Sequence, residues 1–218
     1  MWDRRTRRTG PWKSGLRYTG ALGALAVLAI LLFGAGPSFA AEAWRVKSAS
    51  GAAEIEATDG TLRPAAADDK VRPGEKVRTG EGGRVVLTRK GDTITVAPGS
   101  AMQAADTSTF TRIVQTLGTL LFKVESRPSW GFEVETPYLA AVVKGTTFSV
   151  SVAAQGAAVH VIAGRVQVAT PDRAHARLIR PGQTATVRPS AQGGTGGITV
   201  IESRTDATPD ATPNGADA

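Results

Sequence analysis

Hydrophobic and polar residues alternate most clearly along residues 132–152. The alternation begins with apolar residues between glutamates, and Pro137 interrupts it because proline has no N–H to give to a strand ladder. After Gly145, apolar and hydroxyl side chains alternate as far as Val152. A period of two residues is typical of strands with one buried face. The stretch therefore predicts strands in an all-β core that turn or bulge near Gly145, and it contains no nucleophile with a base beside it.

Shorter runs of the same kind fill the chain between residues 71 and 187. Strands are expected at Lys76–Thr79, around Val85 to Leu87 and around Ile94 to Val96, with glycine- and proline-rich turns between them. Several short strands joined by such turns favour an all-β domain over any helical fold. We expect this domain to cover residues 44–190.

One part of the pattern is ambiguous, because residues 101–126 have a spacing that could also suit a helix. The β-branched residues and Gly118 favour strands instead. We predict strands at Thr111–Gln115 and Thr119–Val124, joined by a turn at Leu117-Gly118.

A weak internal repeat links the two ends of the domain. Arg72-Pro73-Gly74-Glu75 and Arg180-Pro181-Gly182-Gln183 each follow an apolar residue, and each leads into a predicted strand. Repeated units of strand and turn bury one another's apolar faces when they stack. The expected architecture is a single domain with a solenoid-like or roll-like stack of short strands.

Residues 1–40 are typical of a targeting segment, with a basic start and an apolar run from Ala21 to Phe33. This run of 13 residues is shorter than the roughly 20 that a membrane-spanning helix needs. Small residues at Ser38 and Ala40 predict signal-peptide cleavage between Ala40 and Ala41. The alternative is an uncleaved, helical N-terminal anchor in the inner membrane. Both interpretations place the rest of the chain outside the cytoplasm, in the periplasm or secreted.

The charge of the chain is less informative than its net value of +7 suggests. Residues 1–40 hold six of the 26 basic residues and one of the 19 acidic ones, which leaves 20 and 18 for the remainder. A balanced exterior gives little attraction to polyanions, so we expect no nucleic-acid binding. The chain has no cysteine, which excludes disulfides and thiolate metal sites.

The composition shifts after residue 190 toward Gly, Thr, Ala, Pro and Asp. Ile198–Ile201 could add one edge strand, whereas residues 206–218 lack large apolar side chains and are expected to be disordered. The open edge of the sheet is expected near Leu178–Val187 and Ile198–Ile201, where an extended partner could add to it.

The candidate catalytic and metal-binding residues form no recognisable site. His160 and His175 lack the paired spacing of metal ligands and have no acidic residue beside them. Glu133 and Glu135 are expected to share one strand face, where an Arg or Lys on a neighbouring strand would complete an ion pair. We therefore expect no catalytic residue, no metal and no cofactor.

The ordered series of motifs between residues 71 and 187 resembles the FecR domain, the periplasmic module of ferric-citrate-type anti-sigma regulators. The motif residues, to which we assign structural roles, are Pro73, Gly74, Gly80, Pro98, Gly99, Thr136, Pro137, Gly145, Thr146, Phe148, Gly164 and Gly182. The resemblance implies an all-β, solenoid-like or roll-like fold that binds proteins across the envelope and catalyses no reaction. The full regulators also carry a cytoplasmic sigma-binding segment and a second signalling domain, so we expect a stand-alone form here.

The sequence thus predicts a periplasmic, non-enzymatic protein that binds a protein partner in the periplasm or outer membrane and acts in envelope signalling or transcription regulation across the membrane. The alternative is a structural or glycan-binding envelope protein on the same scaffold. The partner's identity and the control of any sigma factor lie beyond these patterns.

Overall fold

The structure is a computed structural model that describes residues 42–106, 110–128, 131–190 and 195–202. The predicted leader, its cleavage site at Ala40 and Ala41, and the predicted tail at 206–218 lie outside these residues. The described part is all-β, which confirms this part of the predicted fold class. Among the described residues, no helix has the length and hydropathy that a membrane span requires.

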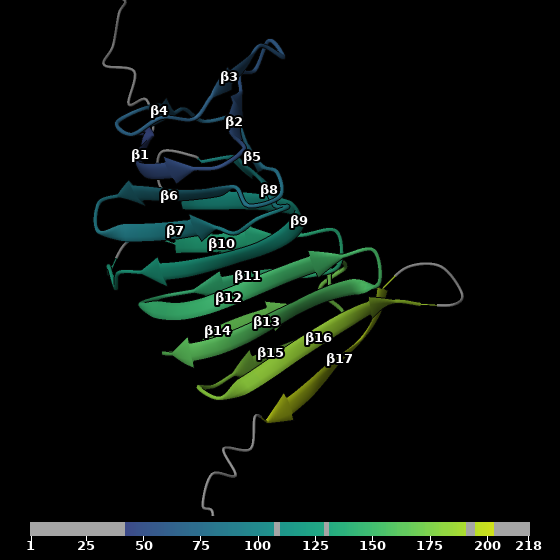
Figure 1. The fold of residues 1–218 in the computed structure, drawn as a ribbon. Coiled ribbons are helices and arrows are strands. Elements are labelled where there is room, and N and C mark those ends of the chain that lie inside the picture. The colour runs from purple at the N-terminus through teal and green to yellow at the C-terminus, as the bar shows by residue number, and fades with distance from the viewer. Residues whose placement is uncertain (1–41, 107–109, 129–130, 191–194, 203–218) are drawn as a thin grey trace, which may run out of the picture. The chain divides into compact units, whose positions relative to one another are not determined.

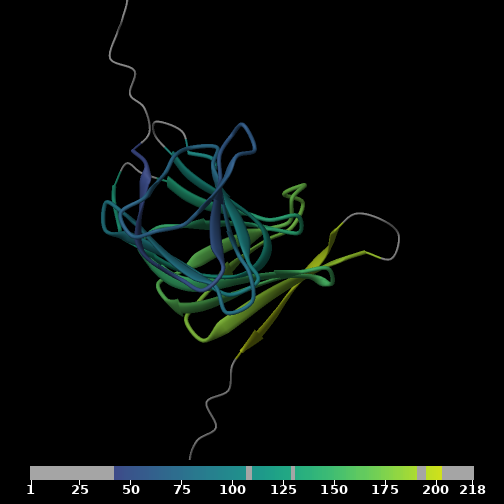
Figure 2. The same cartoon turned by 45° about the horizontal axis from the view of Figure 1, so that its top comes forward.

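The described residues form seventeen strands in two layers that we call layer A and layer B. Figures 1 and 2 show the arrangement of these layers. Neighbouring strands are hydrogen-bonded, and every ladder is antiparallel except the one between β9 and β10. Layer A contains, in spatial order, β4 (Lys70–Val71), β1 (Trp44–Ser50), β6 (Arg84–Arg89), β7 (Asp92–Val96), the second half of β9 (Phe110–Val124), β12 (Thr146–Ala153), β13 (Gly156–Ala163), β16 (Gln183–Pro189) and β17 (Thr195–Glu202).

Layer B has the same number of strands as layer A, and strand β9 contributes one half to each layer. It contains, in spatial order, β3 (Leu62–Pro64), β2 (Ala53–Glu56), β5 (Lys76–Thr79), β8 (Ala101–Ala104), the first half of β9, β10 (Gly131–Glu135), β11 (Ala140–Val143), β14 (Val166–Ala169) and β15 (Ala176–Ile179). The sheet is open, so the solenoid-like or roll-like arrangement is not confirmed.

Strand β9 corrects the prediction of two strands about a turn at Leu117-Gly118. It is one strand of 15 residues whose first half pairs with β8 and β10 and whose second half pairs with β7 and β12. Gly118 has a φ of +81°, and a Cβ there would lie 2.2 Å from the Ser100 side-chain oxygen. Glycine therefore bends the strand from one layer into the other, where the sequence pattern had suggested a reversal.

The predicted alternation produces a single core between the layers. After Gly145, the apolar positions of β12 are buried and the hydroxyl positions lie on the opposite face. Phe148 of β12 stacks on Phe122 of β9 with ring centroids 4.9 Å apart, and Phe122 meets Phe132 of layer B edge to face at 5.9 Å. Such aromatic contacts add stability beyond the area that they bury, and this cluster joins the two layers near β9.

The internal repeat appears in the structure as two turns with the same hydrogen bonds. Glu75 accepts a hydrogen bond from the Arg72 amide at 2.7 Å, and the Gln183 side chain accepts one from the Arg180 amide at 2.9 Å. In each turn the amide of the fourth residue also donates to the carbonyl of the first. The glutamate or glutamine is therefore used to close each turn.

Candidate partner-binding edge

The two ends of the open sheet differ in how their edge strands are built (Figure 1). At the end nearer the N-terminus, β3 has three residues, including Pro64, and β4 has two. Short strands and proline at an edge limit the pairing of a sheet with other chains. This end is therefore poorly suited to accept an additional strand.

The other end is formed by β15 in layer B and by the eight-residue β17 in layer A. Strand β17 pairs with β16 on one side, and no described strand pairs with its other side. The predicted edge strand at 198–201 lies within β17. A long edge strand offers a row of free backbone donors and acceptors, which is the requirement for strand addition.

Three aliphatic side chains on these two edge strands are exposed. Val200 is 38% exposed, Ile201 58% and Leu178 48%. Val200 pairs with the buried Ala185, so its side chain is on the core side of layer A, whereas Ile201 pairs with Thr184 on the outer side. The edge therefore presents one apolar residue on each face of β17.

Arginines surround this edge. Arg177 of β15, Arg180 after it and Arg188 of β16 are exposed, and none forms an ion pair within the described residues. Arg188 lines a hollow of about 190 Å³ together with Thr199 and Ile201. The open edge thus combines backbone groups, aliphatic side chains and positive charge.

Asp172, in the loop between β14 and β15, is already engaged by its own loop. It accepts hydrogen bonds from the Thr170 hydroxyl at 2.6 Å and from the Ala174 amide at 3.1 Å. These hydrogen bonds, that from Thr170 foremost, lower the pKa of the Asp172 carboxyl below its ordinary value of 3.8. Asp172 therefore stabilises the loop as a carboxylate.

The glutamates of β10 form ion pairs on the outer face of layer B, as the sequence predicted. Arg112 of β9 lies opposite Glu133, with 3.5 Å between the guanidinium and the carboxylate, and is 3.8 Å from Glu135. Arg173 of the β14–β15 loop approaches Glu133 at 3.5 Å from the other side. These pairs hold the loop against the sheet, and neither glutamate has the unpaired, accessible geometry of a general base.

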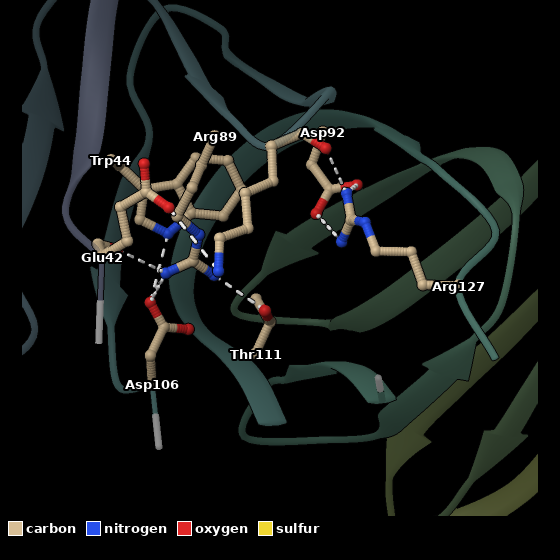
Figure 3. A network of polar contacts seen from close by, with 8 residues as sticks. Glu42, Trp44, Arg89, Asp92, Asp106, Thr111 and Arg127 are labelled. Carbon is tan, nitrogen blue, oxygen red and sulfur yellow. Dashed lines mark hydrogen bonds and ion pairs between the residues drawn. The ribbon is translucent and has the colours of Figure 1, made fainter. Parts of the chain in front are cut away.

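The most buried polar network lies beside β1 and is shown in Figure 3. Arg89 of β6 forms an ion pair with the fully buried side chain of Asp106, donates to the Thr111 hydroxyl at 2.7 Å and lies 4.3 Å from the Trp44 ring centre. It also donates to the Glu42 carbonyl at 3.0 Å. The network ties the first described residues to two strands and a loop, and its charges are satisfied.

A second ion pair in Figure 3 joins Asp92 of β7 to Arg127 through two hydrogen bonds of 2.7 and 3.0 Å. Asp92 is 1% exposed and also accepts the Glu125 amide at 2.9 Å. This bidentate arginine–carboxylate pair holds the segment that follows β9 against the start of β7.

Sequence reasoning missed the Arg89 network, although the sequence contains a signal for it. Val85, Leu87 and Arg89 are two residues apart, and all three side chains are buried in β6. An arginine at a core-facing position of an alternating strand predicts a buried partner.

The two histidines lie apart in the structure. His160 of β13 contacts the Thr184 hydroxyl at 2.9 Å through Nδ1, and His175 lies in the exposed β14–β15 loop. Within the described residues, no group of three His, Asp or Glu side chains gathers in a way that could hold a metal ion.

Several of the motif residues come together at the corners of the sheet. The Thr146 hydroxyl donates to the Arg165 carbonyl at 3.0 Å, and a Cβ on Gly164 would lie 2.6 Å from the Gly145 carbonyl oxygen. The β11–β12 and β13–β14 turns are therefore stacked in contact. Thr136 closes the turn around Pro137 by accepting the Leu139 amide at 2.9 Å. The remaining motif residues lie in other turns, at Pro73, Gly74, Gly80, Pro98, Gly99 and Gly182, or in the core, at Phe148.

Comparison with known proteins agrees with the resemblance in the sequence. A family model described as FecR protein matches residues 75–167. Two crystal structures of a protein from Parabacteroides distasonis ATCC 8503, provisionally described as an anti-sigma factor, align with this chain at a TM-score of 0.51 and with 20% and 21% identity. In each case the match covers 58% of this chain and 59% of that chain, and at this identity it shows the fold alone. No curated protein matches the sequence.

The family match begins at the first of the two repeated turns and ends in β14, so it contains the bent strand β9 and the Phe122–Phe148 stack. It stops before β15 and β17, which form the open edge. The part of the chain that matches the FecR family model is therefore residues 75–167, and the strands that form the open edge follow it.

Proposed function

We propose that this chain is a non-enzymatic, extracytoplasmic FecR-domain regulator that binds a protein partner at the open edge formed by β15 and β17. The observation that carries the proposal is the contrast between the two ends of the sheet: two- and three-residue edge strands at one end, and an eight-residue strand with exposed Val200 and Ile201 at the other. The family match and the related anti-sigma fold support a role in signalling. The sequence pattern of residues 1–40 supports export.

The physical basis of the binding is strand addition. A partner segment in extended conformation would satisfy the free backbone groups of β17 and cover Val200 on one face and Ile201 on the other. Burying these two side chains contributes an amount on the order of 25 cal/mol for each Å² of apolar surface removed from water. No chemical step is required of the domain in this role.

A photo-crosslinking amino acid at position 201 tests the proposal in cells that produce the protein. We expect it to capture one specific protein, and the same replacement at Leu62 of β3 to capture none. Leu62 is a matched control because it is 55% exposed and lies on an edge strand of the other end. Equal capture at both positions, or capture only at Leu62, would contradict binding at the β15–β17 edge.

A structural or glycan-binding role is the second candidate, and the outer face of layer A supports it. One row of paired residues there runs Thr95, Leu121, Ser149, His160, Thr184 and Ile201 across six strands. Hydroxyl groups can hydrogen-bond to sugars. Substituting Thr95 and Ser149, which lie away from β17 in this row, with glutamate would weaken binding to envelope polysaccharide if this face is used, and would leave partner capture at position 201 unchanged.

A further inference from the structure

The arginines of the domain divide into two groups by their surroundings. Eight of those in the described residues form ion pairs: Arg45, Arg63, Arg72, Arg78, Arg89, Arg112, Arg127 and Arg173. The other five form none within the described residues: Arg84, Arg165, Arg177, Arg180 and Arg188. Four of these five lie between residues 165 and 188, which is the part of the chain that leads to the open edge.

The unpaired arginines of the edge occupy both faces of the sheet. Arg177 pairs with the buried Val168, so it belongs to the face of layer B that looks toward layer A, where Val200 is also exposed. Arg188 lies with Ile201 along the hollow on the outer face of layer A. Each face therefore offers one aliphatic side chain and at least one arginine.

The carboxylates of this region have other partners. Asp172 is held by Thr170 and Ala174, and the Glu202 carboxylate accepts a hydrogen bond from Gln183 at 2.9 Å. Elsewhere in the described residues most arginines pair with a carboxylate, and Arg84 is an exception. Because Arg177, Arg180 and Arg188 form no ion pair within the described residues, their positive charge favours partners of opposite charge and disfavours partners of the same charge.

From this we infer that the strand added to β17 is an acidic segment of the partner protein, in which aliphatic residues cover Val200 and Ile201 and Asp or Glu side chains bind Arg177, Arg180 and Arg188. The inference rests on the proposed docking at the β15–β17 edge and specifies its chemistry. Guanidinium groups bind carboxylates through two parallel hydrogen bonds, which gives such a strand a register as well as an affinity. A second copy of this chain fits less well, because an edge-to-edge pair would bring two sets of arginines together.

The test uses the full chain and synthetic strand peptides of about 10 residues. The first peptide is built from Val, Thr and Glu; the second has Lys in place of every Glu; the third has the composition of the first with a proline in its centre. We expect the Glu peptide to bind, and to bind at least about tenfold more tightly than the other two. The affinity of the Glu peptide should fall about tenfold in the double variant Arg177→Glu/Arg188→Glu, because the loss of two charge-assisted hydrogen bonds costs at least a factor of about ten. In Arg84→Glu its affinity should fall by less than about twofold. Arg84 is a matched control because it is exposed and unpaired but lies in β6.

The outcomes separate the inference from the proposal on which it rests. Equal binding of the Glu and Lys peptides, with the proline peptide still weak, would overturn the acidic partner and leave strand addition standing. Equal binding of the Glu and proline peptides would overturn strand addition, since proline blocks a ladder. Binding of none would overturn both. If a chain ending at Glu202 bound the Glu peptide more than tenfold more tightly than the full chain, the C-terminal segment of this protein would be the occupant, in contradiction to a partner strand.

Discussion

At the scale of single residues, two kinds of position determine whether the scaffold forms: buried charges and strained glycines. Arg89 and Asp106 belong to the first kind, because both side chains are almost without solvent contact. Removing one partner of a buried pair leaves the other charge uncompensated, which costs far more than losing an exposed pair.

We expect Arg89→Ala to lower the free energy of unfolding by about 3 kcal/mol, because it leaves the Asp106 carboxylate buried without its cation. Urea denaturation followed by fluorescence measures this value. The matched change, Arg45→Ala, breaks an exposed pair with Asp68 and should cost less than about 1 kcal/mol. Similar costs for the two variants would show that the Arg89 network does not hold the segments together.

Gly118 is the strained position on which the path of β9 depends. We expect Gly118→Ala to lower the free energy of unfolding by about 2 to 5 kcal/mol. An alanine there would be strained by the positive φ, and its Cβ would also clash with Ser100. Gly60→Ala is the control: its φ of +86° carries the strain, but no atom lies within 4 Å of the new Cβ. Its cost should be about 1 to 2 kcal/mol. An equal loss in both variants would rule out close packing at Gly118 as the reason for glycine.

At the scale of elements, the strands rather than the turns hold the two layers together, and the aromatic cluster is the clearest case. We expect Phe148→Ala to cost about 3 to 5 kcal/mol, because it removes a fully buried ring from the stack with Phe122. Leu121→Ala, on the exposed face of the same two strands, should cost less than about 1 kcal/mol. Thermal unfolding of the two variants gives the comparison, and a larger loss for Leu121 would contradict the assignment of faces.

The β14–β15 loop gives a prediction about pH. Because the folded-state pKa of Asp172 lies below its ordinary value of 3.8, its stabilising effect is complete above that pH and is lost as the pH falls through the lower, folded-state pKa. Amide exchange at Ala174 and His175 should therefore accelerate, relative to the rest of the domain, only below about pH 4. In Asp172→Asn this pH-dependent change should disappear. A change that persists in Asp172→Asn would contradict this assignment.

The elements also show which parts of the fold the sequence can predict. The pattern located β5 to the residue, because one face of that strand is buried and the other is not. It failed at Gly118, since a glycine that permits a reversal and one that permits a bend look the same in a sequence. The Arg89–Asp106 pair could have been suspected from its core-facing position, but its partner, 17 residues away, could not.

At the scale of the whole molecule, the described residues form one hydrophobic core between two layers, with short edge strands at one end and the longer β17 at the other. The family match covers most of the core and stops short of the open edge, which lies in β15 and β17. This edge combines exposed Leu178, Val200 and Ile201 with three arginines, Arg177, Arg180 and Arg188, that form no ion pair within the described residues. These features support a protein whose function is to be bound, with a binding site made of backbone, apolar surface and charge.

Amide hydrogen exchange of the full chain, with and without the Glu-containing strand peptide, tests this account most directly. Strand addition predicts slower exchange at alternate residues of β17, Thr195–Glu202, since only the amides that point away from β16 gain a partner. The amides of β3 and β4 should exchange at unchanged rates. Slower exchange confined to the amides of β3 and β4, or to strands in the interior of either layer, with the amides of β17 unaffected, would contradict the account.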